Sequence, residues 1–313
     1  MRGSIGSHAR AHGLRRTMLL AGTAAVAVAT GSAGAAASAP SVHRTHATHA
    51  VVIDGATVSV DPALAKTVPA KVKQQGLVDI TYNDAPPDEL VTGGALVGWE
   101  VDLGRAVAAT LGVPWHAVAS GAFDSFIPGL QNGRYNTSFT SFIYTPARVK
   151  QINIVTYYNV GTGFAVKKGS TIHITKPTDL CGKSVAVIEG SAFIEQLDGI
   201  NPSCKAKGLG AINVASFPSD SAAELAVSSG RDQIYSSSED QLSWLIQQTA
   251  HQFVLQPLNY MPVPEGAGVA KSAGITTQVA RAMDHLIATG AYAKIMKHWS
   301  LTYGLVKSAR IYS

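Results

Sequence analysis

Charged side chains, cysteine and long apolar runs are all scarce in this sequence. Only 14% of the 313 residues are charged, which is typical of a compact soluble protein and argues against intrinsic disorder. Of the 25 basic residues, four arginines lie in residues 1–39, which contain no acid, so the remaining 21 face 20 acidic residues. Four of the five formal positive charges therefore come from residues 1–39. We expect no nucleic-acid partner, because no basic surface remains to bind one.

The apolar run at residues 18–30 is shorter than the about 20 residues that a membrane-spanning helix needs. Arg15 and Arg16 precede it and small residues follow it at 35–39, so the three parts of an export signal are present. We predict a signal peptide at residues 1–39 and an exported protein, extracellular or periplasmic. Whether export uses the Sec or the Tat route stays open.

The two cysteines, Cys181 and Cys204, agree with export. An even count in an oxidising compartment predicts one disulfide, and neither cysteine has a second Cys or a His at metal-ligand spacing. The chain-entropy model gives about 3 kcal/mol for the loop that this bridge closes. The segment LAGT (residues 20–23) resembles a lipoprotein cleavage box in which Thr23 replaces the cysteine that carries the lipid, so we expect no lipid anchor.

Signatures of catalysis are missing as well. There is no Gly-x-Ser-x-Gly elbow, and the histidines after residue 60 are scattered. Three more, His43, His46 and His49, lie in residues 40–60, which we interpret as a flexible leader rather than a metal site, because no helix signal holds their spacing. We predict no metal, no cofactor and no enzymatic activity.

Apolar periodicity after residue 60 alternates between helices and strands. Helices are predicted at 61–76, 101–111, 191–197, 219–228, 241–248 and 278–299. Strands are predicted at 77–83, 115–119, 137–142, 163–167, 184–190, 211–217, 233–236 and 266–272. This alternation indicates βα units and a parallel sheet. The order suggests a first lobe, residues 61–163 and 266–313, interrupted by a second lobe, residues 164–265.

Four segments carry a resemblance to a known family: GWEVDLGRAVAATLGV, FDSFIPGLQNGRYN, YTPAR and TGAYAKIMKHW. They resemble the bacterial extracellular solute-binding proteins of the polar amino-acid type (family 3), the capture subunits of ABC importers, and the resemblance covers residues 61–303. It implies an α/β, two-lobed periplasmic-binding-protein-like fold (type II). Each lobe is then a mostly parallel sheet flanked by helices, and two hinge strands join the lobes.

In the first lobe, the resemblance implies that Arg148, the last residue of TPAR, binds the ligand's carboxylate. A planar guanidinium binds a carboxylate through two parallel hydrogen bonds, which lysine does not reproduce. Thr140 and Ser141 fall where the family donates hydrogen bonds to the ligand. Phe123 matches an aromatic residue that packs on the ligand side chain, and Tyr82, at the end of strand 77–83, completes the candidates of this lobe.

In the second lobe, Gly190-Ser191-Ala192 resembles the turn with which the family meets the ligand carboxylate at a helix N-terminus. Backbone N–H groups attract anions there whatever the side chain, so Ala192 keeps the contact. Ile188 flanks this turn. An N-capping role for Ser191 is the structural alternative, and both roles are compatible.

Two departures from the family leave the ligand's ammonium group without a clear partner. Where members carry aromatic residues around the Pro-Pro pair, this chain has Ala85 and Asp88. Where they carry an ammonium-binding aspartate in the second lobe, it has Ser238, with Glu239 next to it. Glu239, Asp88 and Glu189 are the alternatives for this role, unless the ligand lacks an α-ammonium group.

The sequence therefore predicts capture of a small polar solute, an amino acid or related carboxylate, outside the cytoplasm. Hinge closure of the two lobes would present the solute to an ABC permease in the membrane. We expect the protein to act as a monomer. The alternatives are a dehydratase-like enzyme of the same fold, in which a buried carboxylate such as Glu239 acts as acid or base, and a ligand sensor for a partner receptor.

Overall fold

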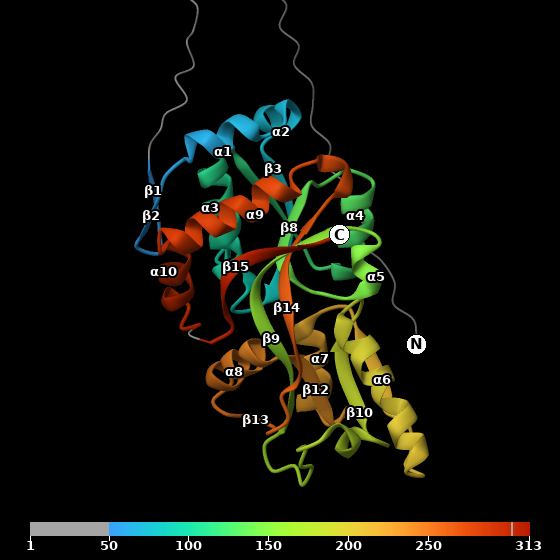
Figure 1. Cartoon of the computed structure of the whole chain (residues 1–313). Helices are drawn as coiled ribbons and strands as arrows, with labels where there is room; N and C mark the ends of the chain where they lie inside the picture. Colours follow the sequence, from blue (N-terminus) through green and yellow to red (C-terminus); the bar gives the residue numbers. More distant parts are fainter. Residues whose placement is uncertain (1–49, 302) are drawn as a thin grey trace, which may run out of the picture. The chain divides into compact units, whose positions relative to one another are not determined.

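Two long strands, β9 (Asn153–Lys167) and β14 (Tyr260–Val269), pair antiparallel and link two groups of elements (Figure 1). The structure, a computed structural model, describes residues 50–301 and 303–313, which belong to one compact unit. The predicted signal peptide and residues 40–49 of the predicted leader lie outside the described residues. The lobe boundaries predicted at 163/164 and 265/266 fall inside the two long strands.

The first lobe has three strands that run parallel: β3 (Leu77–Tyr82), β7 (Trp115–Ser120) and β8 (Thr137–Ile143). A small antiparallel sheet follows β3 and consists of β4 (Asp84–Ala85), β5 (Glu89–Thr92) and β6 (Ala95–Val97). The helices of this lobe are α1 (Pro62–Thr67), α2 (Ala70–Gln75), α3 (Trp99–Leu111), η1 (Phe123–Ser125), α4 (Phe126–Gln131), α5 (Pro146–Val149), η3 (Lys271–Ala273), α9 (Thr276–Ala288) and α10 (Ala291–His298).

The second lobe repeats the βα pattern between the two long strands. Its strands are β10 (Ser184–Ile188), β11 (Asn213–Phe217), β12 (Ile234–Ser238) and β13 (Phe253–Leu255). Its helices are η2 (Pro177–Leu180), α6 (Ala192–Ala206), α7 (Asp220–Ser228) and α8 (Glu239–Gln248). β10 is parallel to both β11 and β12, as the sequence predicted for this segment.

Ten of the strands in the described residues form one mixed sheet that passes through both lobes. The order is β11-β10-β12-β9-β14-β8-β3-β7, and β13 and the C-terminal strand β15 (Leu305–Tyr312) also pair with β9. The long strands are thus part of both lobes. None of the helices in residues 50–301 and 303–313 combines the length and the apolar character that a membrane span requires.

Helix α3 shows how the core forms from the sequence pattern. Leu103, Val107 and Leu111 recur at helical spacing and are buried. Trp99, at the start of the helix, is fully buried and packs edge-on against Tyr157 of β9, with ring centroids 5.8 Å apart. Burial of each such side chain stabilises the fold by roughly 1.5–3 kcal/mol. Through this contact, the segment GWEVDLGRAV packs against β9, which crosses between the lobes.

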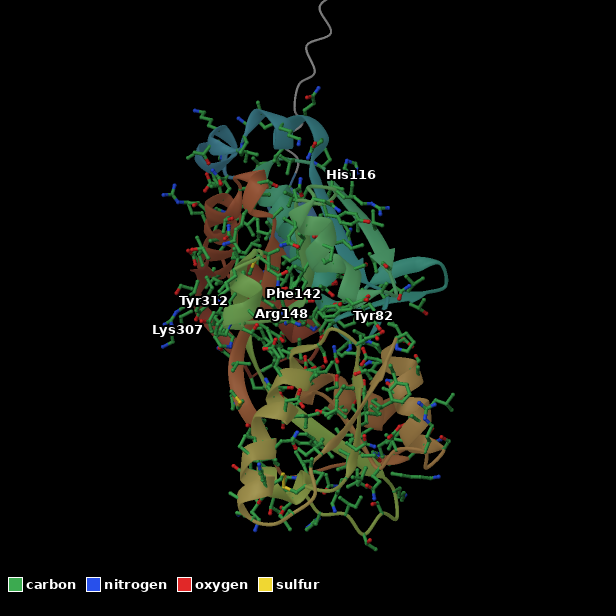
Figure 2. The ribbon with its side chains drawn as sticks, turned by 90° about the vertical axis from the view of Figure 1, so that its right-hand side faces the viewer. Tyr82, His116, Phe142, Arg148, Lys307 and Tyr312 are labelled. Atoms are coloured by element: carbon green, nitrogen blue, oxygen red, sulfur yellow. A yellow bond between two sulfur atoms is a disulfide. The ribbon has the colours of Figure 1, made fainter. Side chains whose placement is uncertain are left out.

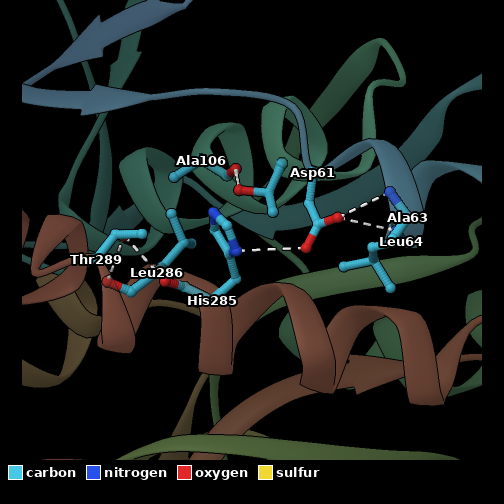
Figure 3. Close-up of polar contacts among 8 residues, drawn as sticks. Asp61, Ala63, Leu64, Ala106, His285, Leu286 and Thr289 are labelled. Atoms are coloured by element: carbon cyan, nitrogen blue, oxygen red, sulfur yellow. Dashed lines mark hydrogen bonds and ion pairs between the residues drawn. The ribbon is translucent and has the colours of Figure 1, made fainter.

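Asp61 links the start of α1 to helix α9 (Figure 3). One carboxylate oxygen accepts hydrogen bonds from the backbone N–H groups of Ala63 and Leu64, at 2.9 and 3.0 Å, and the other lies 3.4 Å from Nδ1 of His285. The bond to Leu64 is the largest cause that lowers the pKa of Asp61. α1 ends at Thr67 because Val68, which precedes Pro69, takes an extended conformation.

Three segments differ from the sequence prediction. Residues 51–58, predicted as part of a flexible leader, form a hairpin of β1 (Val51–Ile53) and β2 (Ala56–Val58) whose inward residues are buried. The C-terminal segment, interpreted as a polar tail, is strand β15. The helix predicted at 278–299 is broken by Gly290, which has φ +76°.

The structure contains the predicted disulfide between Cys181 and Cys204, with Cα atoms 5.6 Å apart. Cys181 follows η2, and Cys204 lies in the last turn of α6, where it is fully buried. The bridge therefore fastens the C-terminal end of α6, while the N-terminal end of the same helix points to the cavity described next.

Candidate functional site

A cavity lies where the carboxyl ends of two pairs of parallel strands, one pair in each lobe, face each other. It encloses about 470 Å³ of space between atoms, with the open solvent at its mouth included. Strands β3, β8, β10 and β12 end at its wall. The lining residues are Tyr82, Ala85, Glu89, Phe123, Thr140, Ser141, Ile143, Arg148, Ile188, Ser191, Ala192, Phe193, Asp220, Ser238, Gln241 and Glu265.

Arg148 is the one cationic side chain among the described residues that line the cavity. Thr145 caps the short helix α5 by accepting a hydrogen bond from the N–H of Arg148. The guanidinium donates to the carbonyl oxygens of Ile143, at 2.9 Å, and Gly190, at 3.1 Å. Figure 2 shows Arg148 and Phe142 at the junction of the two lobes, and the guanidinium carbon lies 5.3 Å from the centre of the Phe142 ring.

This guanidinium is buried without an anion. Arg148 is 6% exposed, and in the described part of the chain no carboxylate forms an ion pair with it. Burial lowers the pKa of Arg148 to about 10, with the charge of Glu195 acting in the opposite direction, so the group stays cationic at neutral pH. A buried, unpaired cation is unfavourable unless a group of opposite charge reaches it.

The two hydroxyl groups at the end of β8 are already engaged by neighbouring acids. Thr140 donates to Glu89, and Ser141 donates to Asp88 at 3.1 Å. Ser141 also has φ +46°, a left-handed conformation that non-glycine residues adopt mainly where surrounding structure enforces it. The strand end is therefore held in place by contacts within the first lobe.

In the second lobe, two helix starts face the cavity with unpaired hydroxyl groups. Ser191 precedes α6 and Ser238 precedes α8, and neither side chain caps its helix. Both Oγ atoms are buried and have no hydrogen-bond partner within residues 50–301 and 303–313. The N-terminus of α6 also brings the N–H dipoles of Ala192 and its neighbours to the wall, which favours a negative group there.

Three carboxyl groups line the cavity, on Glu89, Asp220 and Glu265. Burial, followed by the charge of Asp84, raises the pKa of Asp220 to about 7, although Tyr235 donates a hydrogen bond to it. Burial also raises the pKa of Glu265 well above the ordinary range. Within the described residues no group of three or more histidine, cysteine or acidic side chains is arranged to hold a metal ion.

Four hydrogen bonds join the lobes near the cavity. Besides the bond from Arg148 to Gly190, Gln241 of α8 donates to Asp88 at 2.7 Å. The hydroxyl and the N–H of Ser221, in α7, donate to the carboxylate of Asp84 at 2.7 and 3.1 Å. The two lobes are thus in direct contact at three places.

Comparison with known proteins decides the family. The family model for bacterial extracellular solute-binding proteins, family 3, matches residues 77–302. The chain belongs to this family. The family 3 assignment and the two-lobed α/β fold predicted from the sequence are both confirmed.

Three proteins similar to this family 3 protein are arginine-binding proteins by name. The arginine-binding protein ArgT of Corynebacterium glutamicum is 25% identical over 255 residues, which cover 80% of this chain and 83% of that protein. ABC transporter arginine-binding protein 1 of Escherichia coli is 27% identical over 41% of this chain and 51% of its own length. A solved ancestral arginine-binding protein bound to arginine is 27% identical, covers 71% of this chain and 97% of its own, and superposes with a TM-score of 0.65.

Most sequence candidates line the cavity of this family 3 protein, but three do not. Asp88 is fully buried behind the wall, where it accepts hydrogen bonds from Trp99 at 2.7 Å, from Ser141 and from Gln241. Glu239 starts α8 and accepts from Asn259 instead. The physical reason is register: Ser238 ends the strand facing the cavity, so the next side chain projects elsewhere. Glu189, the third alternative, is also absent from the lining.

Sequence reasoning missed the carboxyl groups that do reach the cavity. Glu89 directly follows Asp88, and Asp220 is the first residue of a helix that follows a strand, the same position that Ala192 occupies in α6. That recurring strand-to-helix position was a usable signal for Asp220. Glu265 precedes Gly266 on the returning strand, and no local pattern marks it.

Proposed function

We propose that this protein captures an α-amino acid with a cationic side chain, arginine being the first candidate, and presents it to an ABC permease. The observation that carries the proposal is the buried guanidinium of Arg148, which faces a cavity between two lobes without an anionic partner. Membership of a solute-binding family and the arginine-binding names of its relatives support it.

The α-carboxylate of the ligand would bind at Arg148 and at the N–H groups that open α6. The guanidinium keeps donors free beyond its bonds to Ile143 and Gly190, because it carries five N–H groups in a planar fork. Ser191 adds a buried hydroxyl without a partner. A carboxylate placed between these groups touches both lobes, so it stabilises the state in which they are together.

The ligand side chain would extend toward the aromatic end of the cavity. Tyr82 and Phe123 pack edge-on there with ring centroids 6.1 Å apart, and Ala85 leaves room beside them. Asp220 supplies a carboxyl group from the second lobe. Aromatic faces and a carboxylate are the chemistry that binds a guanidinium or an ammonium group, and they support a cationic side chain.

We further propose that the protein is exported after removal of residues 1–39, carries no lipid, acts as a monomer and binds its ligand without turnover. The family's extracellular character supports export. Mass spectrometry of the secreted chain gives its N-terminus and any lipid, and light scattering gives its mass in solution. An NMR spectrum of arginine incubated with the protein shows whether the ligand is returned unchanged.

Calorimetric titration of the purified protein with arginine, lysine, citrulline, glutamine and agmatine tests the proposed function. Citrulline lacks the side-chain charge of arginine, and agmatine lacks its carboxylate. We expect arginine or lysine to bind, citrulline and glutamine to bind more weakly, and agmatine not to bind. Absence of binding by every amino acid, or binding of agmatine as tight as that of arginine, contradicts the proposal.

A further inference from the structure

We propose that Glu265, on the strand β14 that crosses between the lobes, binds the α-ammonium group of the captured amino acid. This inference rests on the proposed function, and it names the residue that distinguishes an amino acid from a simple carboxylic acid.

Glu265 is a buried acid with an unfilled site next to it. It is 1% exposed and lines the cavity, and neither carboxylate oxygen has a hydrogen-bond partner within residues 50–301 and 303–313. A buried carboxyl group without partners is costly, and a ligand cation with N–H donors removes that cost.

The strand register pairs this acid with a residue that Arg148 contacts. Glu265 pairs directly with Ile143 of β8 in the antiparallel ladder, and the carbonyl oxygen of Ile143 accepts a hydrogen bond from Arg148. Directly opposed residues have Cα atoms roughly 4.5–5.5 Å apart and side chains on the same face. An α-amino acid carries its carboxylate and its ammonium on one carbon, so it requires a receptor cation and a receptor anion in one cavity, and Arg148 and Glu265 line the same one.

The other two acids of the wall are less free to take the same role. One carboxylate oxygen of Glu89 accepts a hydrogen bond from the hydroxyl of Thr140, and one of Asp220 accepts a hydrogen bond from the hydroxyl of Tyr235. Asp220 also lies at the start of α7, in the second lobe, and its charge raises the pKa of Tyr82 at the aromatic end of the cavity. Glu265 alone of the three keeps both oxygens unpaired.

The groups around Glu265 add a measurable consequence. Burial, followed by the negative charges of Asp240, Asp88 and Glu100, raises the pKa of Glu265, and the phenols packed near it come from β9 and α10. Without a ligand the carboxyl group therefore keeps its proton to a higher pH than an exposed glutamate does. An ammonium group favours the ionised form, so binding releases a proton, which calorimetry detects by repeating the titration in buffers of different ionisation enthalpy.

The decisive experiment compares arginine with δ-guanidinovalerate, which is arginine without its α-amino group, on the wild type, Glu265→Gln and Glu239→Gln. Glu239→Gln is the matched control, because it makes the same change outside the cavity. We expect the wild type and the control to prefer arginine by about 30-fold or more, as expected for a buried charge pair. Glu265→Gln should reduce this preference below about threefold while leaving δ-guanidinovalerate binding unchanged or tighter.

Each other outcome overturns the inference. Equal weakening of both ligands by Glu265→Gln means that the residue only shapes the cavity. Loss of the preference in Asp220→Asn or Glu89→Gln, but not in Glu265→Gln, assigns the ammonium to another acid. A wild type that binds both ligands equally, without proton release, contradicts the inference even if no variant folds, while leaving amino-acid capture intact. Failure of the wild type to bind any amino acid contradicts the proposed function itself.

Discussion

The two lobes hold their halves of the site in different ways. In the first lobe, Thr140 and Ser141 are tied to Glu89 and Asp88, and this half is preformed. In the second lobe, the hydroxyls of Ser191 and Ser238 have no partner in the described residues. Because a buried polar group without a partner is unfavourable, the second lobe gains most when a ligand supplies one.

This difference suggests an order of events. The ligand would first dock on the preformed first lobe. The second lobe would then close, and its unpaired hydroxyl groups would form hydrogen bonds to the bound ligand. Closure is stabilised only by as much as the ligand prefers the closed over the open arrangement. Variants in one lobe or at the contact between lobes therefore separate docking from closure.

The largest effect should come from Arg148→Ala, which removes the cation of the preformed half. We expect arginine affinity in calorimetry to fall tenfold or more, because charge-assisted bonds to the carboxylate are lost. The arginine affinity of Arg148→Lys should lie between those of the wild type and Arg148→Ala, since an ammonium group keeps the charge but cannot form the two parallel hydrogen bonds. Unchanged affinity in Arg148→Ala would show that the first lobe does not hold the carboxylate.

Gly190→Ala should act on closure rather than on docking. Gly190 has φ +75°, and a Cβ there would lie 3.0 Å from Cα of Asp124 across the lobe contact. Left-handed strain costs roughly 1–2 kcal/mol in either state, but the contact with Asp124 exists only when the lobes meet. We expect about three- to tenfold weaker binding and a ligand-bound form that stays more open in X-ray scattering. A fully closed complex with native affinity would contradict this.

Asp84→Ala should weaken closure slightly by removing the two hydrogen bonds to Ser221. Each such bond contributes about 0.5–1.5 kcal/mol net, and exposure reduces that, so we expect about threefold faster ligand release in stopped-flow measurements. Asp198→Ala, an exposed acid on α6 away from the lobe contact, is the control. Equal release rates for Asp84→Ala and the control would show that Asp84 does not stabilise the closed state.

The lobes should differ least in their response to pH. Burial raises the pKa of Asp79 to about 8 and of Glu100 to about 7 in the first lobe, and of Asp220 to about 7 in the second. The folded state then holds protons that the unfolded chain releases above about pH 4, so stability without ligand falls as pH rises from about 5 to 8. A loss of 1 kcal/mol lowers the melting temperature by about 2–4 °C. A melting temperature that rises across this range contradicts the assignment.

Local pattern predicted those parts of the fold whose signals lie close together in the chain. Helix α3 was visible from the spacing of Leu103, Val107 and Leu111, and strand β3 from its alternation. β15 was missed because five of its eight residues remain exposed beside β9, so its sequence is as polar as a tail. The hairpin of residues 51–58 was missed because its three-residue strands are too short to show a period.

The sequence likewise predicted the position of only some of the candidate site residues. Arg148, Thr140, Ser141 and Ser191 lie in or beside short motifs, so the sequence pointed to them. Asp88 and Glu239 were chosen because they adjoin motif positions, and adjacency in sequence does not decide which face a side chain takes.

The sequence by itself determined the family, the alternation of strands and helices, the cysteine pair and the candidate arginine Arg148. Each of these signals depends on residues that lie close to one another in the chain. Only the tertiary structure decided which acids share a cavity with that arginine. Glu265 reaches it through the register of β14 against β8, and Asp220 through the approach of the second lobe. Convergence of this kind depends on strand pairing across more than a hundred residues of chain, and no local pattern encodes it.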